Sequence, residues 1–178
     1  MSTSTEIRWH ARAGQGAKTA AHLLALALLR SGKSVQAFPE YGPERRGAPV
    51  RAYTRVSDRP IRRHDSVVDP DVVVVLDSSL AREPGVAEGV CPETLVLVNA
   101  EEPVEGLPEA RVVYVPATRL AEASGVRFAN LVMTGAVAAA IGEPPVETLE
   151  EQACTLLGKK SDPQAVRAGI EEGHAWLR

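Results

Sequence analysis

The turn at residues 12–16 carries the first group of side chains that could bind a ligand. It reads Arg12-Ala13-Gly14-Gln15-Gly16 and joins a strand-like segment to a helix-like one. Free N–H groups and the positive end of the helix dipole favour an anion at such a turn, and Arg12 adds charge. The turn matches neither the dinucleotide motif GxGxxG nor a Walker loop. Two interpretations stay open: a phosphate site, or glycines that only allow close packing.

A cluster of arginines forms the second group. Residues 45–63 contain seven arginines and a single acid, although the whole chain has a net charge of −3. Arginine forks bind carboxylates and phosphates through paired hydrogen bonds, so Arg45, Arg46 and Arg51 are candidates to hold a phosphate-bearing cofactor or an acidic partner. The alternative is a solvated surface on which Glu40 and Glu44 pair with the arginines.

The other reactive side chains form no recognisable centre. Only Cys91 and Cys154 are present, 63 residues apart, whereas an iron–sulfur cluster normally needs four thiolates. The four histidines are too scattered for a metal-ligand pattern, and no serine, cysteine or acid lies in a known nucleophile motif. We therefore predict no catalytic residue, no metal site and no cofactor bound by this chain alone.

Length and composition indicate one domain over residues 1–178, with 44% apolar side chains and no interdomain linker. The longest nearly continuous apolar stretch, 23–29, is far shorter than the roughly 20 residues that a bilayer helix needs. The N-terminus lacks a signal pattern. We therefore predict a cytoplasmic protein that binds no membrane. The negative charge and the few aromatic residues argue against a nucleic-acid partner.

The elements that position the two groups follow from apolar periodicity and from breaker residues. Residues 6–10 predict a short strand, and the Ala- and Leu-rich stretch 17–30 predicts a buried helix that Gly32 ends. Residues 35–38 predict a second strand. The prolines and glycines of residues 39–49 predict a loop.

Residues 50–56 alternate between an apolar set and the set Arg51, Tyr53 and Arg55, and a turn signal follows at 57–60. This pattern predicts an antiparallel β-hairpin with one basic face. We predict further strands over 71–77, 94–99 and 111–115, and helices over 117–124, 130–141, 146–157 and 163–177. The predicted fold is α/β: a three-layer α/β/α single domain with a mixed, largely parallel sheet.

Several of these stretches resemble one known family. Residues 7–16, and above all the run FPEYGPERRGAPV over 38–50, are similar to the gamma subunit of pyruvate and ketoisovalerate ferredoxin oxidoreductases, which is domain III of the fused enzymes. The resemblance continues through 69–74 and 130–142, so it covers nearly the whole chain. One departure is that Ala11 and Ala13 stand where the family usually has glycine.

The resemblance implies a reaction, namely oxidative decarboxylation of a 2-oxo acid with coenzyme A (CoA) to acyl-CoA, carbon dioxide and low-potential electrons. It implies thiamine diphosphate, magnesium and 4Fe–4S clusters in partner subunits, because this chain has no Gly-Asp-Gly thiamine motif and too few cysteines. The partners implied are alpha, beta and ferredoxin-like delta subunits. The Arg-Arg-Gly-Ala-Pro continuation is similar to the pyruvate, branched-chain and arylglyoxylate branches, which favours pyruvate-like substrates or arylglyoxylates such as phenylglyoxylate.

The role that the resemblance implies for this chain is non-catalytic. It would pack on the catalytic subunits, with residues 38–49 in a contact between subunits, and it would help to bind CoA. The residues expected to contact CoA are Arg12, Gly14, Gln15, Gly16, Arg45 and Arg46. Two other functions stay open: a stand-alone nucleotide- or phosphate-binding α/β protein that uses the 12–16 turn, and a nucleic-acid-binding module that uses the basic hairpin.

Overall fold

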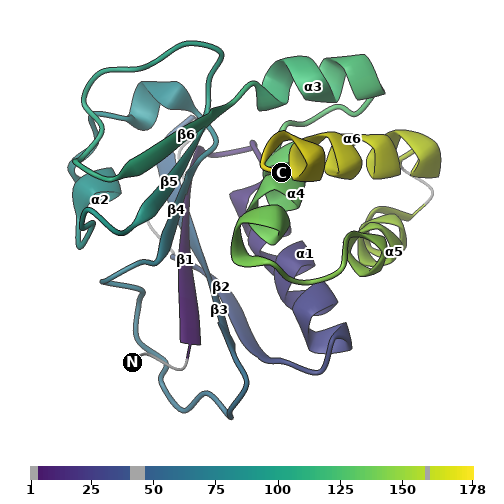
Figure 1. Cartoon of the computed structure of the whole chain (residues 1–178), viewed down its shortest axis with the longest axis horizontal. Coiled ribbons are helices and arrows are strands. Elements are labelled where there is room, and N and C mark those ends of the chain that lie inside the picture. The colour runs from purple at the N-terminus through teal and green to yellow at the C-terminus, as the bar shows by residue number, and fades with distance from the viewer. Residues whose placement is uncertain (1–3, 41–46, 159–160) are drawn as a thin grey trace.

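Strands and helices alternate along the computed structural model, which describes residues 4–40, 47–158 and 161–178 (Figure 1). The first elements are β1 (Ser4–Arg12), α1 (Ala17–Arg30), β2 (Ser34–Glu40), β3 (Pro49–Ser57) and β4 (Val72–Val75). The short helices η1 (Ser78–Leu80) and α2 (Pro84–Ala87) come next, before β5 (Leu95–Asn99) and β6 (Arg111–Val115). The chain ends with the helices α3 (Ala117–Ser124), α4 (Asn130–Ile141), α5 (Val146–Leu157) and α6 (Pro163–Trp176).

The strands form one sheet in the order β2-β3-β1-β4-β5-β6. β1, β4, β5 and β6 run parallel to one another, whereas β3 runs antiparallel between β1 and β2. This arrangement confirms the prediction of a mixed, largely parallel sheet. All of β4 is buried, as predicted for a central strand whose β-branched residues are covered on both faces.

The β-hairpin uses different segments from those predicted. Residues 50–56 do form a strand, but β3 pairs with the preceding β2 and with β1, and no strand lies between Ser57 and β4 in this described stretch. The turn signals after Ser57 therefore end a strand and close no hairpin. The predicted loop also starts too early, because β2 continues through Pro39 to Glu40. β2 is an edge strand, a place where a proline is tolerated.

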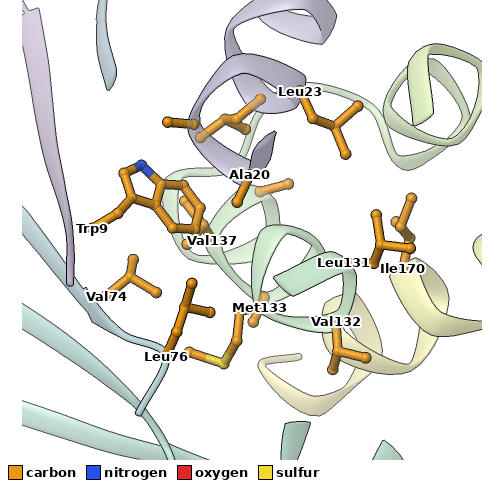
Figure 2. Packing of buried hydrophobic residues seen from close by; sticks show 14 of the residues in the cluster. Trp9, Ala20, Leu23, Val74, Leu76, Leu131, Val132, Met133, Val137 and Ile170 are labelled. Atoms are coloured by element: carbon orange, nitrogen blue, oxygen red, sulfur yellow. The ribbon is translucent and has the colours of Figure 1, made fainter. Parts of the chain in front are cut away.

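The two faces of the sheet are covered unequally. α1, α3, α4, α5 and α6 lie on one side, where Trp9 of β1, Val74 of β4 and Leu76 just after β4 meet Met133 and Val137 of α4 (Figures 1 and 2). On the other side a smaller apolar cluster includes Leu80 of η1 and Val86 of α2. The second helical layer is therefore thin, which leaves room on that face for polar strand residues.

Small residues let α4 and α6 approach closely, as expected from the composition of residues 130–141. A Cβ at Gly135 would lie 3.0 Å from the carbonyl carbon of Ile170, and a Cβ at Gly173 would lie 3.0 Å from the Cα of Val132. Side chains at these two positions would force the helices apart. In the described part of the chain, no helix is both long and apolar enough to span a bilayer.

Candidate functional site

The carboxyl ends of the parallel strands meet at one edge of the sheet, where the chain leaves β1 and β4 in opposite directions. After β1 it enters α1, which packs on the helical face, and after β4 it enters η1, whose Leu80 packs on the opposite face. The N–H of Leu76 donates to the His10 carbonyl at 2.8 Å and extends the β1–β4 pairing to this edge. Open α/β sheets bind ligands where successive connections diverge in this way.

Arg12 lies at this edge and holds three segments together. Its Nε and Nη2 donate to Ser79 Oγ at 3.1 and 2.8 Å, and its Nη1 donates to the Gly47 carbonyl at 3.1 Å. Its Nε also lies 3.5 Å from Asp77 Oδ2. These contacts direct three of the five guanidinium N–H groups at protein acceptors, while the side chain stays 36% exposed.

Gln15 braces the turn from within. Its Oε1 accepts from the Arg12 backbone N–H at 2.8 Å, and its Nε2 donates to Asp77 Oδ2 at 2.8 Å. The Gln15 backbone N–H closes the turn on the Arg12 carbonyl at 3.1 Å. Both polar atoms of the side chain are therefore engaged within the protein, and Gln15 fixes the shape of the turn.

Asp77 is the anionic member of this cluster. Although partial burial would raise its pKa, hydrogen bonds from Ser79 and Gln15, with the charge of Arg12, hold the pKa of Asp77 below its ordinary value. Asp77 is therefore ionised at neutral pH and offsets the charge of Arg12. Net positive charge for an anion at this edge has to come from additional cations.

The two predicted glycines both adopt left-handed backbone conformations. Gly14 has φ +99° and Gly16 has φ +85°. Gly16 is also the N-cap of α1, which has no side-chain cap hydrogen bond and no acidic residue in its first turn within the described residues. Asn130, at the start of α4, donates from Nδ2 to the Gly16 carbonyl at 3.2 Å. The first-turn N–H groups of α1 thus have no capping side chain.

Arg45 and Arg46 fall outside the described residues, but the segment that follows them contacts the glycine turn. Arg12 Nη1 donates to the Gly47 carbonyl, and the Ala13 N–H donates to the Ala48 carbonyl at 2.9 Å. The fold therefore brings the glycine turn together with Gly47 and Ala48 of the arginine-rich stretch, although more than 30 residues separate them in sequence.

A buried polar layer on the opposite face of the sheet was missed by the sequence analysis. Arg8 is 0% exposed, and its guanidinium donates to the carbonyls of Val67, Val68, Val86 and Glu88. Its Nε also donates to His10 Nε2 at 3.1 Å. Burial, with the charges of Arg8 and Arg51, lowers the pKa of His10 to about 3, so the imidazole is neutral.

The predicted basic face of β3 belongs to the same layer, and its charges are compensated. Arg55 is 1% exposed and pairs with Glu6 at 3.0 Å. Arg51 lies 3.1 Å from Glu88. The alternation of polar and apolar residues along β1 is the sequence signal that points to this layer. Because these two arginines are buried or paired, the strand offers little free positive charge to a nucleic acid.

The described residues contain no group of three or more histidine, cysteine or acidic side chains that could hold a metal ion. Cys91 is exposed and Cys154 is partly buried on α5. These residues offer no ligand set for an iron–sulfur cluster or for magnesium.

Comparison with known proteins identifies the family. Residues 6–172 match the model for pyruvate ferredoxin/flavodoxin oxidoreductase. The chain is 42% identical to pyruvate synthase subunit PorC of Thermotoga maritima, over 94% of this chain and 93% of that protein. It is 44% identical to the pyruvate/ketoisovalerate oxidoreductases common subunit gamma of Thermococcus litoralis, over 94% and 96% of the two chains.

A solved structure agrees with this assignment. The crystal structure of the Thermotoga maritima pyruvate oxidoreductase subunit PORC superposes with a TM-score of 0.84, at 36% identity, over 98% of this chain and 97% of that one. The resemblance seen in the motifs is confirmed along nearly the whole length of both chains. The chain belongs to the pyruvate ferredoxin/flavodoxin oxidoreductase family.

Proposed function

We propose that this chain is the gamma-type, non-catalytic subunit of a CoA-dependent 2-oxoacid:acceptor oxidoreductase. The observation that carries the proposal is the end-to-end similarity to proteins named as single subunits, which spans 94% of this chain and 93–96% of those proteins. A chain that matches a subunit along its whole length takes the same place in an assembly.

The side chains available for metal binding support a role for this chain that differs from the roles of its partner subunits. Two cysteines are too few for a cluster, and the described residues contain no group of three or more metal-ligating side chains. Both observations support a place for the 4Fe–4S clusters, thiamine diphosphate and its magnesium in partner subunits of alpha, beta and ferredoxin-like delta type. Thiamine diphosphate would supply the carbanion chemistry when bound there. This chain contributes binding surface.

CoA is the ligand for which the carboxyl edge is suited. The start of α1 presents N–H donors without a capping side chain, and Arg12 belongs to the turn that leads into this helix. Because Asp77 offsets Arg12, Arg45 and Arg46 supply the net charge that the phosphates of CoA require. Gln15 and Asp77 hold Arg12 in place, and Arg12 in turn holds the Gly47 end of the arginine-bearing segment.

Purification of the tagged chain from its source tests the assembly. We expect larger, brown, cluster-bearing chains to co-purify in fixed stoichiometry and to be identified by mass spectrometry. The preparation should oxidise a pyruvate-like 2-oxo acid or phenylglyoxylate, and the preferred substrate is the one with the highest kcat/KM. A monomer that binds nucleotides without partners would instead support the stand-alone function.

An arginine variant tests the contact with CoA. In the assembled enzyme, Arg46→Ala should raise the apparent CoA requirement roughly ten- to over a hundredfold, since a lost charged contact costs about 1.5–3 kcal/mol. Decarboxylation of the 2-oxo acid at the thiamine should be largely retained. Arg82→Ala is the control, because Arg82 is 73% exposed and pairs only with exposed Glu105 among the described residues. If the Arg46→Ala enzyme assembles and its CoA dependence is unchanged, the arginines serve assembly and do not bind CoA.

A further inference from the structure

A hollow of about 560 Å³ opens between α1, β2 and the end of α5. Phe38, Pro39, Leu156 and Leu157 form its apolar part. Lys18 and His22 of α1 form its polar wall. Of the residues assigned to CoA, Arg12, Gly14, Gln15 and Gly16 do not line this hollow, so its function is a separate question.

The rim of the hollow has the character of an interface. β2 is the edge strand of the sheet and pairs only with β3 within the described residues. Leu156 is 38% exposed on α5, one of a few large apolar side chains at the surface. An unpaired strand edge beside exposed apolar side chains is a surface that another chain can cover.

The charge on the hollow is one-sided. Lys18 and His22 are four residues apart on α1 and therefore share a face. Among the described residues, the lining includes no acid and Lys18 makes no ion pair. A ligand that complements this hollow would therefore carry a carboxylate next to an apolar segment.

We propose that this hollow receives a segment of another subunit of the same oxidoreductase, with apolar side chains seated on Phe38 and Leu156 and a carboxylate paired with Lys18. The inference rests on the proposed function, which places the chain in an assembly. A polypeptide suits this surface, because it could seat side chains in the hollow and also extend along the edge strand β2, whereas a small molecule would occupy the hollow alone. Here the polar groups occupy one wall, and an open strand edge continues the surface.

Matched variants of the complex test the proposal. Leu156→Glu should weaken association of this subunit with the rest of the enzyme at least tenfold, measured by native mass spectrometry over a dilution series. Leu29→Glu is the control, since Leu29 lies on α1, is 55% exposed and does not line the hollow. Circular dichroism of both variants checks the fold, which exposed substitutions leave intact.

Zero-length carbodiimide cross-linking of the wild-type complex identifies the occupant. The expected product joins Lys18 to an Asp or Glu of a partner subunit within an apolar stretch, and Lys18→Gln abolishes it. Equal assembly of the Leu156→Glu and Leu29→Glu subunits overturns the proposal. So does a Leu156→Glu complex that assembles normally but binds CoA or 2-oxo acid more weakly, because the hollow is then a ligand subsite. If the wild-type chain joins no other subunit, the proposed function itself fails.

Discussion

Replacing Gly16 with alanine should destabilise the folded chain by about 3 kcal/mol, because it strains the turn and breaks the contact of the turn with α4. Gly16 has φ +85°, a conformation that costs other residues about 1–2 kcal/mol. A Cβ would lie 3.1 Å from Asn130 Cγ and closer still to Nδ2. Asn130 is 6% exposed, so displacing it leaves a buried amide without its partner, at a further cost of about 1–3 kcal/mol.

Gly14→Ala separates the two contributions, because Gly14 has φ +99° but no atom within 4 Å of an added Cβ. Its cost should be the strain alone, about 1–2 kcal/mol. Urea unfolding followed by circular dichroism measures each variant. The double variant Gly16→Ala with Asn130→Ala should cost less than the sum of the two single variants. Equal costs for Gly14→Ala and Gly16→Ala, or an additive double variant, would refute the reasoning.

Three further predictions concern the buried polar layer and the cofactors. Arg8→Met should destabilise the chain by about 3–5 kcal/mol in urea unfolding, because it leaves buried carbonyls without donors. The control Arg82→Met, at an exposed position, should cost less than about 1 kcal/mol. His10 stays neutral in the folded chain down to about pH 3, but it becomes protonated below about pH 6.5 when the chain is unfolded. The free energy of unfolding should therefore fall by up to about 1.4 kcal/mol per pH unit as the pH is lowered from about 6.5 to about 3. A pH series of unfolding curves should show this component missing in His10→Gln. Metal analysis and chromatography of the isolated chain should find neither stoichiometric iron nor thiamine diphosphate.

Apolar periodicity was sufficient to predict most elements. The helix over 17–30 and the all-valine β4 are each specified by local pattern, because the spacing of apolar residues shows which faces of an element are buried. The strand ends were less certain. β2 runs through Pro39, a residue that indicates a loop unless the strand is known to lie at the edge of the sheet.

The pairing of strands and the pairing of charged side chains depend on contacts between residues that are distant in sequence. β3 could pair with a strand before or after it, and local turn residues favoured the wrong partner. Arg8 and Arg55 resemble surface residues by type. The carbonyl acceptors of Arg8 lie 59–80 residues away, and the acceptors of Arg55 lie up to 49 residues away, so only the folded chain shows that the two arginines are buried. The same holds for Asp77, which completes the candidate site with Arg12 and Gln15.

The most direct test of the subunit role is reconstitution of the enzyme from its separately produced subunits, with and without this chain. The activity measured is reduction of a viologen dye by a pyruvate-like 2-oxo acid in the presence of CoA. We predict that CoA-dependent reduction appears only when this chain is present in the assembly, and that it is lost when the chain is left out. Full CoA-dependent activity without this chain would contradict its role as a subunit that the reaction requires.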